Sequence, residues 1–141
     1  MMAEAVPGGT GPTSDAGATS GRVRIVDDNR DAAETLCALL QLDGSRIEIA
    51  YSGAEAIDKG ARFLPQLVLL DLGMPGMDGY LTCRSVRACD WGRRAMIVAV
   101  TGWGQDADRR RSREAGFDGH LVKPVDYAAL KDLLRRATTG S

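Results

Sequence analysis

Five polar side chains that can take part in chemistry directly follow short apolar stretches of the chain. The first stretch runs into Asp27 and Asp28, a later one into Asp71, and two others into Thr101 and Lys123. Three carboxylates held close together repel one another, and some take up protons unless a cation lies among them. These groups offer hard oxygen ligands, so the set favours Mg²⁺, or alternatively Mn²⁺, over zinc or copper.

The ammonium of Lys123 and the hydroxyl of Thr101 are both suited to binding phosphoryl oxygens. A carboxylate beside Mg²⁺ and a lysine can attack phosphorus and form an aspartyl phosphate. Each aspartate taken alone has a plainer interpretation, as a helix cap or the end of a strand. The five groups taken together favour a site for phosphoryl chemistry.

Strand and helix patterns alternate along the chain. The predicted strands are Val23–Val26, Arg46–Ala50, Leu67–Leu70, Ala95–Val100 and Gly119–Val122. The predicted helices are Arg30–Leu42, Ser52–Phe63, Tyr80–Ala88, Gln105–Ala115 and a last helix capped by Asp126 that ends near Ala137. Apolar strands imply burial on both faces, so we predict a doubly wound α/β domain with a parallel sheet between helices. Ligands bind beyond the carboxyl ends of such strands, where the five polar groups converge if their strands are neighbours.

Composition excludes several classes of protein. The 141 residues are 44% hydrophobic and 26% charged, with a formal net charge of −1, which argues against direct nucleic-acid or membrane binding. The longest apolar run, Ala95–Val100, is far shorter than the roughly 20 residues of a membrane span, and no leader peptide is recognisable. Three cysteines without CxxC spacing indicate neither a disulfide framework nor a zinc site. We therefore expect a cytoplasmic protein.

The two ends of the chain differ in composition from its middle. Residues 1–21 are almost all Gly, Ala, Ser, Thr and Pro, which predicts a flexible tail. The rest is long enough for one domain, which we place at residues 22–138, with a C-terminal tail at 139–141.

Four segments resemble receiver domains of two-component response regulators. They are VDDN (26–29), LLDLGMPGMDG (69–79), VTG (100–102) and LVKPVD (121–126). The resemblance covers about residues 22–138, and the stretch from 101 to 126 is most similar to receivers of hybrid sensor histidine kinases. It implies a flavodoxin-like (βα)5 domain with five parallel strands in the order 2-1-3-4-5. The chain is then either a stand-alone receiver or part of a hybrid kinase.

The resemblance also implies roles for particular residues. Asp71 would accept a phosphoryl group from a phosphohistidine on a sensor histidine kinase or a histidine phosphotransfer protein. Asp28, with Asp27 acting through water, would hold Mg²⁺ beside Asp71 and the backbone carbonyl of Gly73. Such a domain is not an enzyme in the usual sense, since it catalyses only its own phosphorylation and slow dephosphorylation.

A switch is implied as well. Lys123 would pair with the acceptor or its phosphoryl group, Thr101 would move to bond a phosphoryl oxygen, and the Lys123–Pro124 bond would be cis. The surface that repacks would be read by a downstream protein partner, and phosphorylation-dependent homodimerisation is a further expectation. His120 stands where receivers usually carry Tyr or Phe. It is either a pH-sensitive element of the switch or a ring that fills the same space.

Two other functions are consistent with parts of the pattern. One is an unphosphorylated pseudo-receiver scaffold, although no acidic or lysine position is missing. The other is a Mg²⁺-dependent phosphatase of the haloacid-dehalogenase type, whose nucleophile belongs to a DxDx(T/V) pattern after the first strand. Here the candidate Asp71 follows the third predicted strand and Gly73 lies two residues beyond it, which opposes the second alternative.

Overall fold

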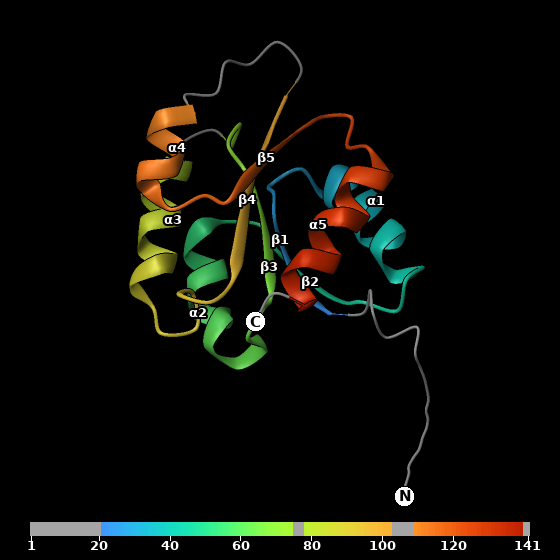
Figure 1. Ribbon diagram of the computed structural model, residues 1–141, viewed down its shortest axis with the longest axis horizontal. Helices are drawn as coiled ribbons and strands as arrows, with labels where there is room; N and C mark the ends of the chain where they lie inside the picture. Colours follow the sequence, from blue (N-terminus) through green and yellow to red (C-terminus); the bar gives the residue numbers. More distant parts are fainter. Residues whose placement is uncertain (1–20, 75–77, 103–108, 140–141) are drawn as a thin grey trace, which may run out of the picture.

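The computed structural model describes residues 21–74, 78–102 and 109–139, and within these ranges five strands alternate with five helices (Figure 1). The strands are β1 (Arg22–Val26), β2 (Arg46–Ala50), β3 (Leu67–Asp71), β4 (Met96–Thr101) and β5 (Gly119–Val122). The helices are α1 (Arg30–Gln41), α2 (Gly53–Phe63), α3 (Gly79–Ala88), α4 (Arg109–Ala115) and α5 (Tyr127–Thr139). The alternation predicted from the sequence is confirmed.

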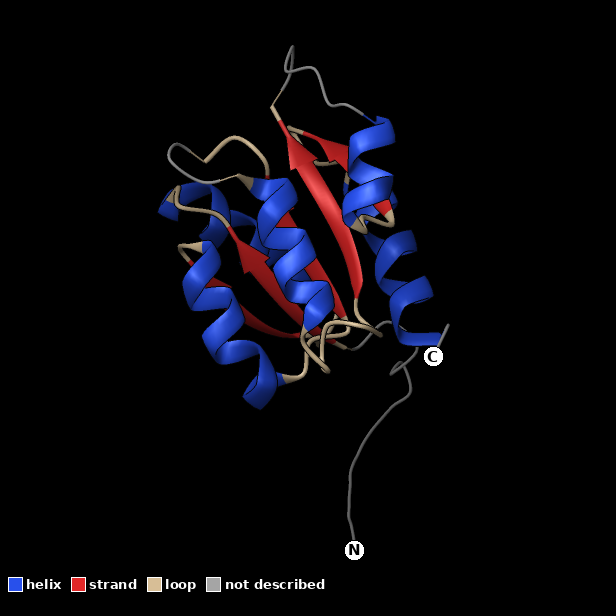
Figure 2. Ribbon diagram, turned by 90° about the vertical axis from the view of Figure 1, so that its left-hand side faces the viewer, coloured by secondary structure: helices blue, strands red, loops and turns tan. Residues whose placement is uncertain are grey.

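All strand pairs are parallel, and the sheet has the order β2-β1-β3-β4-β5. The predicted doubly wound, flavodoxin-like fold is therefore confirmed. Helices α1 and α5 cover one face of the sheet, and α2, α3 and α4 cover the other (Figure 1). Figure 2 shows the strand arrowheads directed toward the same edge, which gathers the loops that follow the strands.

Burial explains which strands lie in the centre. Every residue of β3 is buried, and β4 is buried except at Met96, because helices cover both faces of these strands. The edge strand β2 alternates between exposed and partly buried side chains and is buried only at Ala50. In β1 the apolar pattern is interrupted by Arg24, whose side chain is nevertheless wholly buried.

Polar caps start the helices near the carboxyl edge of the sheet. The side chain of Asn29 accepts a hydrogen bond from Ala32 N (3.0 Å) at the start of α1. Ser52 Oγ accepts from Glu55 N (3.1 Å) at the start of α2, where the sequence predicts that this helix begins. These caps fix where the chain leaves β1 and β2, and they thereby limit the movement of the loops that carry polar groups.

Some predicted segments fall partly outside the described residues. Residues 105–108 of the helix predicted at Gln105–Ala115 are not described, and α4 begins at Arg109. Residues 1–20 and 140–141 of the predicted tails are also outside the described residues. Gly21 of the predicted N-terminal tail is described, and its carbonyl accepts a hydrogen bond from Arg46 N (2.8 Å). Across the described parts of the chain, none of the helices combines the length and apolar character that crossing a membrane requires.

Gly92 occupies a position where a side chain cannot fit. It lies in the turn between α3 and β4, its N donates to Cys89 O (3.0 Å), and its carbonyl accepts from Arg87 Nη1 (2.8 Å). A Cβ at this position would overlap the backbone carbonyl of Val86, which no side-chain rotation can relieve. Close packing of this turn against α3 therefore requires glycine.

We predict that Gly92→Ala lowers the free energy of unfolding by about 1–3 kcal/mol, because the overlap forces the backbone to shift. Gly119→Ala is the matched control, since a Cβ there meets only side-chain atoms of Leu133 and Val98 at 4.0 Å. It should be neutral or stabilising by up to about 1 kcal/mol. Urea unfolding followed by circular dichroism measures both changes. Equal effects of the two substitutions would contradict this account of Gly92.

Candidate functional site

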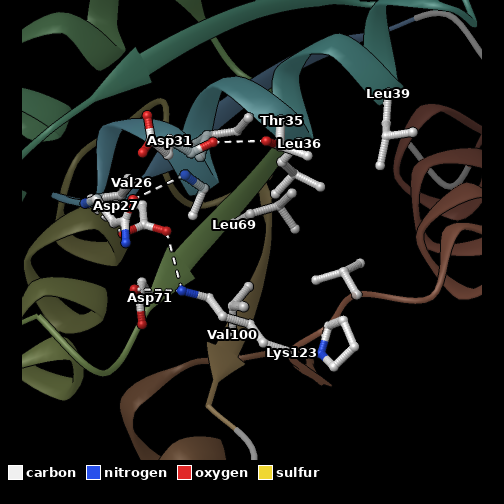
Figure 3. A pocket seen from close by; sticks show the side chains of 15 residues that line it. Val26, Asp27, Asp31, Thr35, Leu36, Leu39, Leu69, Asp71, Val100 and Lys123 are labelled. Atoms are coloured by element: carbon white, nitrogen blue, oxygen red, sulfur yellow. Dashed lines mark hydrogen bonds and ion pairs between the residues drawn. The ribbon is translucent and has the colours of Figure 1, made fainter.

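The carboxyl edge of the sheet brings together charged side chains from strands far apart in sequence. Asp27 follows β1, Asp71 ends β3, and Lys123 follows β5. The Nζ atom of Lys123 lies 3.0 Å from Asp71 Oδ2 and 3.3 Å from Asp27 Oδ2. Figure 3 shows the lysine pointing between the two carboxylates. The predicted convergence of these three residues is confirmed.

Backbone groups hold the two carboxylates from their other side. Asn29 N donates to Asp27 Oδ1 (2.9 Å), and Gly73 N donates to Asp71 Oδ1 (2.7 Å). Each aspartate is thus bonded through both oxygens, one to a backbone N–H of its own loop and the other to Lys123. The orientations of the two side chains are therefore fixed before anything else binds.

Burial makes the negative charges of Asp27 and Asp71 less favourable than they would be in water. Asp27 is 6% exposed and Asp71 is 7% exposed. Burial raises the pKa of Asp27, and the hydrogen bond and charge of Asp71 raise it further, against the lowering effects of Asn29 N and Lys123. Burial acts to lower the pKa of Lys123, but the two carboxylates outweigh it and the pKa is raised. Two carboxylates therefore compete for one ammonium, and the site favours a further cation.

The remaining predicted site residues lie around this cluster. Thr101 is the last residue of β4, is 2% exposed, and its carbonyl accepts from Lys123 N (2.8 Å). The Lys123–Pro124 peptide is cis, as predicted. Asp28 is exposed and lies outside the hydrogen-bonded cluster, and its N–H donates to Met74 Sδ (3.1 Å).

The carboxylate oxygens of this cluster are ligands of the kind that hard divalent cations prefer. Among the described residues, no group of three or more His, Cys, Asp or Glu side chains is arranged to hold a metal ion. The buried Asp27 and Asp71 carry more negative charge than Lys123 neutralises, and Asp28 adds an exposed carboxylate next to them in sequence. Oxygen donors with uncompensated charge fit Mg²⁺.

A cavity of about 440 Å³ adjoins the charged cluster and is a feature that the sequence analysis missed. It extends from Asp27, Asp71 and Lys123 along the side of α1 (Figure 3). Its wall is formed largely by small and apolar side chains, among them Ala32, Thr35, Leu36, Leu39 and Val125. The sequence signal that could have indicated this surface is the pair Leu36 and Leu39, which lie in the helix predicted directly after Asp27 and Asp28.

His120 connects β5 to α4. Its Nε2 atom lies 2.9 Å from Ser112 Oγ, within hydrogen-bond distance of a side chain that is wholly buried. The ring also packs beside Phe117, with ring centroids 6.3 Å apart. Burial lowers the pKa of His120, and the nearby charge of Arg109 lowers it further. The imidazole is therefore neutral at neutral pH and joins a strand to a helix.

Comparisons with known proteins agree with this geometry. The family model for the response regulator receiver domain matches residues 23–135 of this chain. The transcriptional regulatory protein ResD of Bacillus subtilis is 36% identical over 124 residues, which cover 85% of this chain and 50% of ResD. The response regulator PleD of Caulobacter vibrioides is 34% identical over 119 residues, which cover 84% of this chain and 26% of PleD. The chain thus spans half or less of the length of these relatives.

Solved structures show the same fold. The crystal structure of a putative response regulator from Chloroflexus aurantiacus has a TM-score of 0.76 and 30% identity, covering 84% of this chain and 97% of that one. The receiver domain of the sensor histidine kinase PA1611 from Pseudomonas aeruginosa, with magnesium in its active-site cleft, has a TM-score of 0.75 and 31% identity. That match covers 86% of this chain and 99% of the other. The fold, the clustered aspartates and lysine, and the family match together show that this chain belongs to the response regulator receiver domains of two-component signalling.

Proposed function

We propose that this receiver domain is a phosphoacceptor in a His–Asp phosphorelay and that Asp71 is the residue phosphorylated. Receiver domains are signalling domains rather than enzymes of the usual kind. The observation that carries the proposal is the contact of Lys123 Nζ with both Asp71 and Asp27 at the carboxyl edge of the sheet. A buried carboxylate beside an ammonium and open to a cavity is placed to react with an incoming phosphoryl group.

In the proposed reaction a carboxylate oxygen of Asp71 attacks the phosphorus of a phosphohistidine. The new O–P bond forms as the donor's P–N bond breaks, and the leaving imidazole nitrogen keeps the bonding electron pair and takes up a proton. Lys123 offsets negative charge on the phosphoryl oxygens, and the hydroxyl of Thr101 donates a hydrogen bond to one of them. Attack by water on the phosphorus later breaks the bond between Asp71 and phosphorus, which releases inorganic phosphate and regenerates the Asp71 carboxylate.

The residues that would hold Mg²⁺ in this proposal are Asp28, Asp71, the carbonyl of Gly73 and, through water, Asp27. When bound, the cation would offset the negative charge that gathers on the phosphoryl oxygens. The competition of Asp27 and Asp71 for one ammonium supports such a site. The PA1611 receiver, which is similar to this chain, has magnesium coordinated in its cleft. Mn²⁺ has the same preference for oxygen ligands and is an alternative occupant.

The proposed donor is a sensor histidine kinase or a histidine phosphotransfer protein, which would approach the cavity along α1. Phosphorylation adds about 1.5–2 negative charges beside Lys123 and Thr101. Thr101 and His120 then act as the switch, because His120 joins β5 to α4 next to the strand that ends at Thr101. A downstream protein partner, or a second copy of the phosphorylated chain, would bind the repacked surface.

A phosphatase of the haloacid-dehalogenase type is disfavoured by the place of Asp71 at the end of the third strand. The pseudo-receiver alternative, a scaffold that is not phosphorylated, is distinguished from a phosphoacceptor by direct phosphorylation. The first experiment below therefore tests the pseudo-receiver alternative.

Incubation with Mg²⁺ and acetyl phosphate is expected to add one phosphoryl group to the wild-type chain, measured as intact mass. Asp71→Asn should abolish the gain because the amide is a far weaker nucleophile, and EDTA should abolish it in the wild type. Asp31→Asn is the matched control, since Asp31 also lines the cavity but is exposed and lies outside the cluster. A folded wild-type protein that binds Mg²⁺ yet gains no mass would refute self-catalysed phosphorylation by acetyl phosphate.

Calorimetric titration with Mg²⁺ tests the cation site separately. Asp28→Asn and Asp27→Asn are each expected to weaken binding by about tenfold or more, since each removes a carboxylate from the proposed site. Asp31→Asn should leave the affinity within about twofold. Unchanged binding in both Asp28→Asn and Asp27→Asn would place the cation elsewhere, whatever the result with acetyl phosphate.

The lowered pKa of His120 predicts that the stability of the domain falls at acidic pH. The folded-state pKa of His120 is lowered from the value of about 6.5 expected in the unfolded chain. The unfolded chain therefore takes up this proton first, and the stabilising contribution of neutral His120 is complete above about pH 6.5 and declines as the pH falls toward the folded-state pKa.

Urea unfolding between pH 7.5 and 5 should show a steeper loss of stability in the wild type than in His120→Phe, where this titration is absent. The substitution also leaves the buried Ser112 hydroxyl without its partner, which lowers stability equally at every pH and does not alter the comparison. Parallel stability profiles for the two proteins would exclude a contribution from His120 protonation.

A further inference from the structure

Arg24 is a buried cation whose hydrogen-bonding capacity is only partly used. It lies in the middle of β1 and is 0% exposed. Its Nη2 atom donates to Glu48 Oε1 on β2 (3.0 Å). In the part of the chain that the structure describes, the buried Nε and Nη1 atoms have no hydrogen-bond partner. Burying a charged donor without a partner is costly, so these atoms call for an acceptor.

A cavity of about 480 Å³ lies beside Arg24, between the edge strand β2 and helix α2. Parallel pairing places Arg24 next to Glu48, and Arg46 lies two residues earlier on β2. Helix α2 adds Lys59 and Arg62 to the wall of the cavity. Four cationic side chains therefore surround it, against one lining carboxylate.

The carboxylates near the cavity do not neutralise its four cationic side chains. Glu48 is the only carboxylate hydrogen-bonded to Arg24 among the described residues, and its side chain is 47% exposed. Lys59 is paired with Glu55 at 2.7 Å, outside the lining of the cavity. No ion pair of Arg46 or Arg62 is found within the described ranges. The cavity therefore has an excess of positive charge.

The aromatic ring of Phe63 orders two of the cations. The guanidinium carbon of Arg24 lies 5.1 Å from the ring centroid, and that of Arg46 lies 6.0 Å from it. Phe63 is itself 8% exposed and lines the cavity together with Arg24. Contact with a ring limits the number of conformations that each guanidinium adopts, which reduces the entropy lost when an anion binds.

We propose that this cavity is a binding site for a phosphate-class oxyanion, either inorganic phosphate or the phosphate group of a small ester. Guanidinium groups match the oxygen geometry of phosphate, and several cations around one cavity suit its double negative charge. Arg46 and Arg62 are exposed and line the same cavity, so they would supply further charged donors to the anion beside Arg24. The site is separate from Asp71 and Lys123, and the inference does not rest on the proposed function.

The test is a titration of the ¹⁵N-labelled full chain with inorganic phosphate and with pyrophosphate, without Mg²⁺ and at constant ionic strength. We expect saturable amide shifts in β2 and the second half of α2. The pair Arg46→Gln/Arg62→Gln should weaken binding by at least about tenfold, through loss of two charged donors. The control pair Arg110→Gln/Arg113→Gln removes the same charge from exposed positions of α4 and should leave the affinity unchanged.

Arg24→Met tests the buried cation itself and should abolish the saturable shifts. Its spectrum and urea unfolding show whether it folds, and if it does not, the Arg46/Arg62 pair decides the question. Asp71→Asn should bind phosphate as the wild type does. Tighter binding of pyrophosphate would indicate a diphosphate ester as ligand, and equal binding would indicate a single phosphate group. The absence of saturable shifts at constant ionic strength, shifts that persist in the Arg46/Arg62 pair, or shifts that centre on Lys123 would overturn the proposal.

Discussion

The ion pair between Lys123 and the two carboxylates of Asp27 and Asp71 is the interaction on which the functional edge of this domain depends. It joins residues 96 and 52 positions apart in the chain. Removing the ammonium would leave two buried carboxylates facing each other, a strongly unfavourable arrangement. The strand order places β1, β3, β4 and β5 side by side, and this order brings the three residues within hydrogen-bond distance.

The rest of the fold provides a rigid support for this cluster. The apolar strands β3 and β4 are packed on both faces, so the positions of their last residues, Asp71 and Thr101, are fixed by the core. The loops beyond the strands contribute backbone N–H groups from Asn29 and Gly73. A stable sheet with reactive groups just past its edge allows chemistry and rearrangement in the loops without loss of the core.

Charge is distributed unevenly over a chain whose formal net charge is only −1. Beyond the carboxyl end of β1, Asp27 and Asp71 share one ammonium and favour a cation. Within the same strand, Arg24 and its cationic neighbours favour an anion. Groups of opposite charge thus lie close together along β1, with the core residues Ile25 and Val26 between Arg24 and Asp27. Net charge alone conceals both of them.

The amino-acid sequence by itself determined the order of the strands and helices, since apolar runs, caps and glycines act over a few neighbouring residues. It also determined that Asp27, Asp71, Thr101 and Lys123 stand at strand ends, and the resemblance of its LVKPVD segment to receiver domains implied the cis bond after Lys123. Only the tertiary structure decided that Asp27 rather than Asp28 pairs with Lys123, that His120 meets Ser112, and that Arg24 is buried with two nitrogens unpaired. These outcomes depend on distances between segments brought together by packing, and no local pattern of residues specifies such distances.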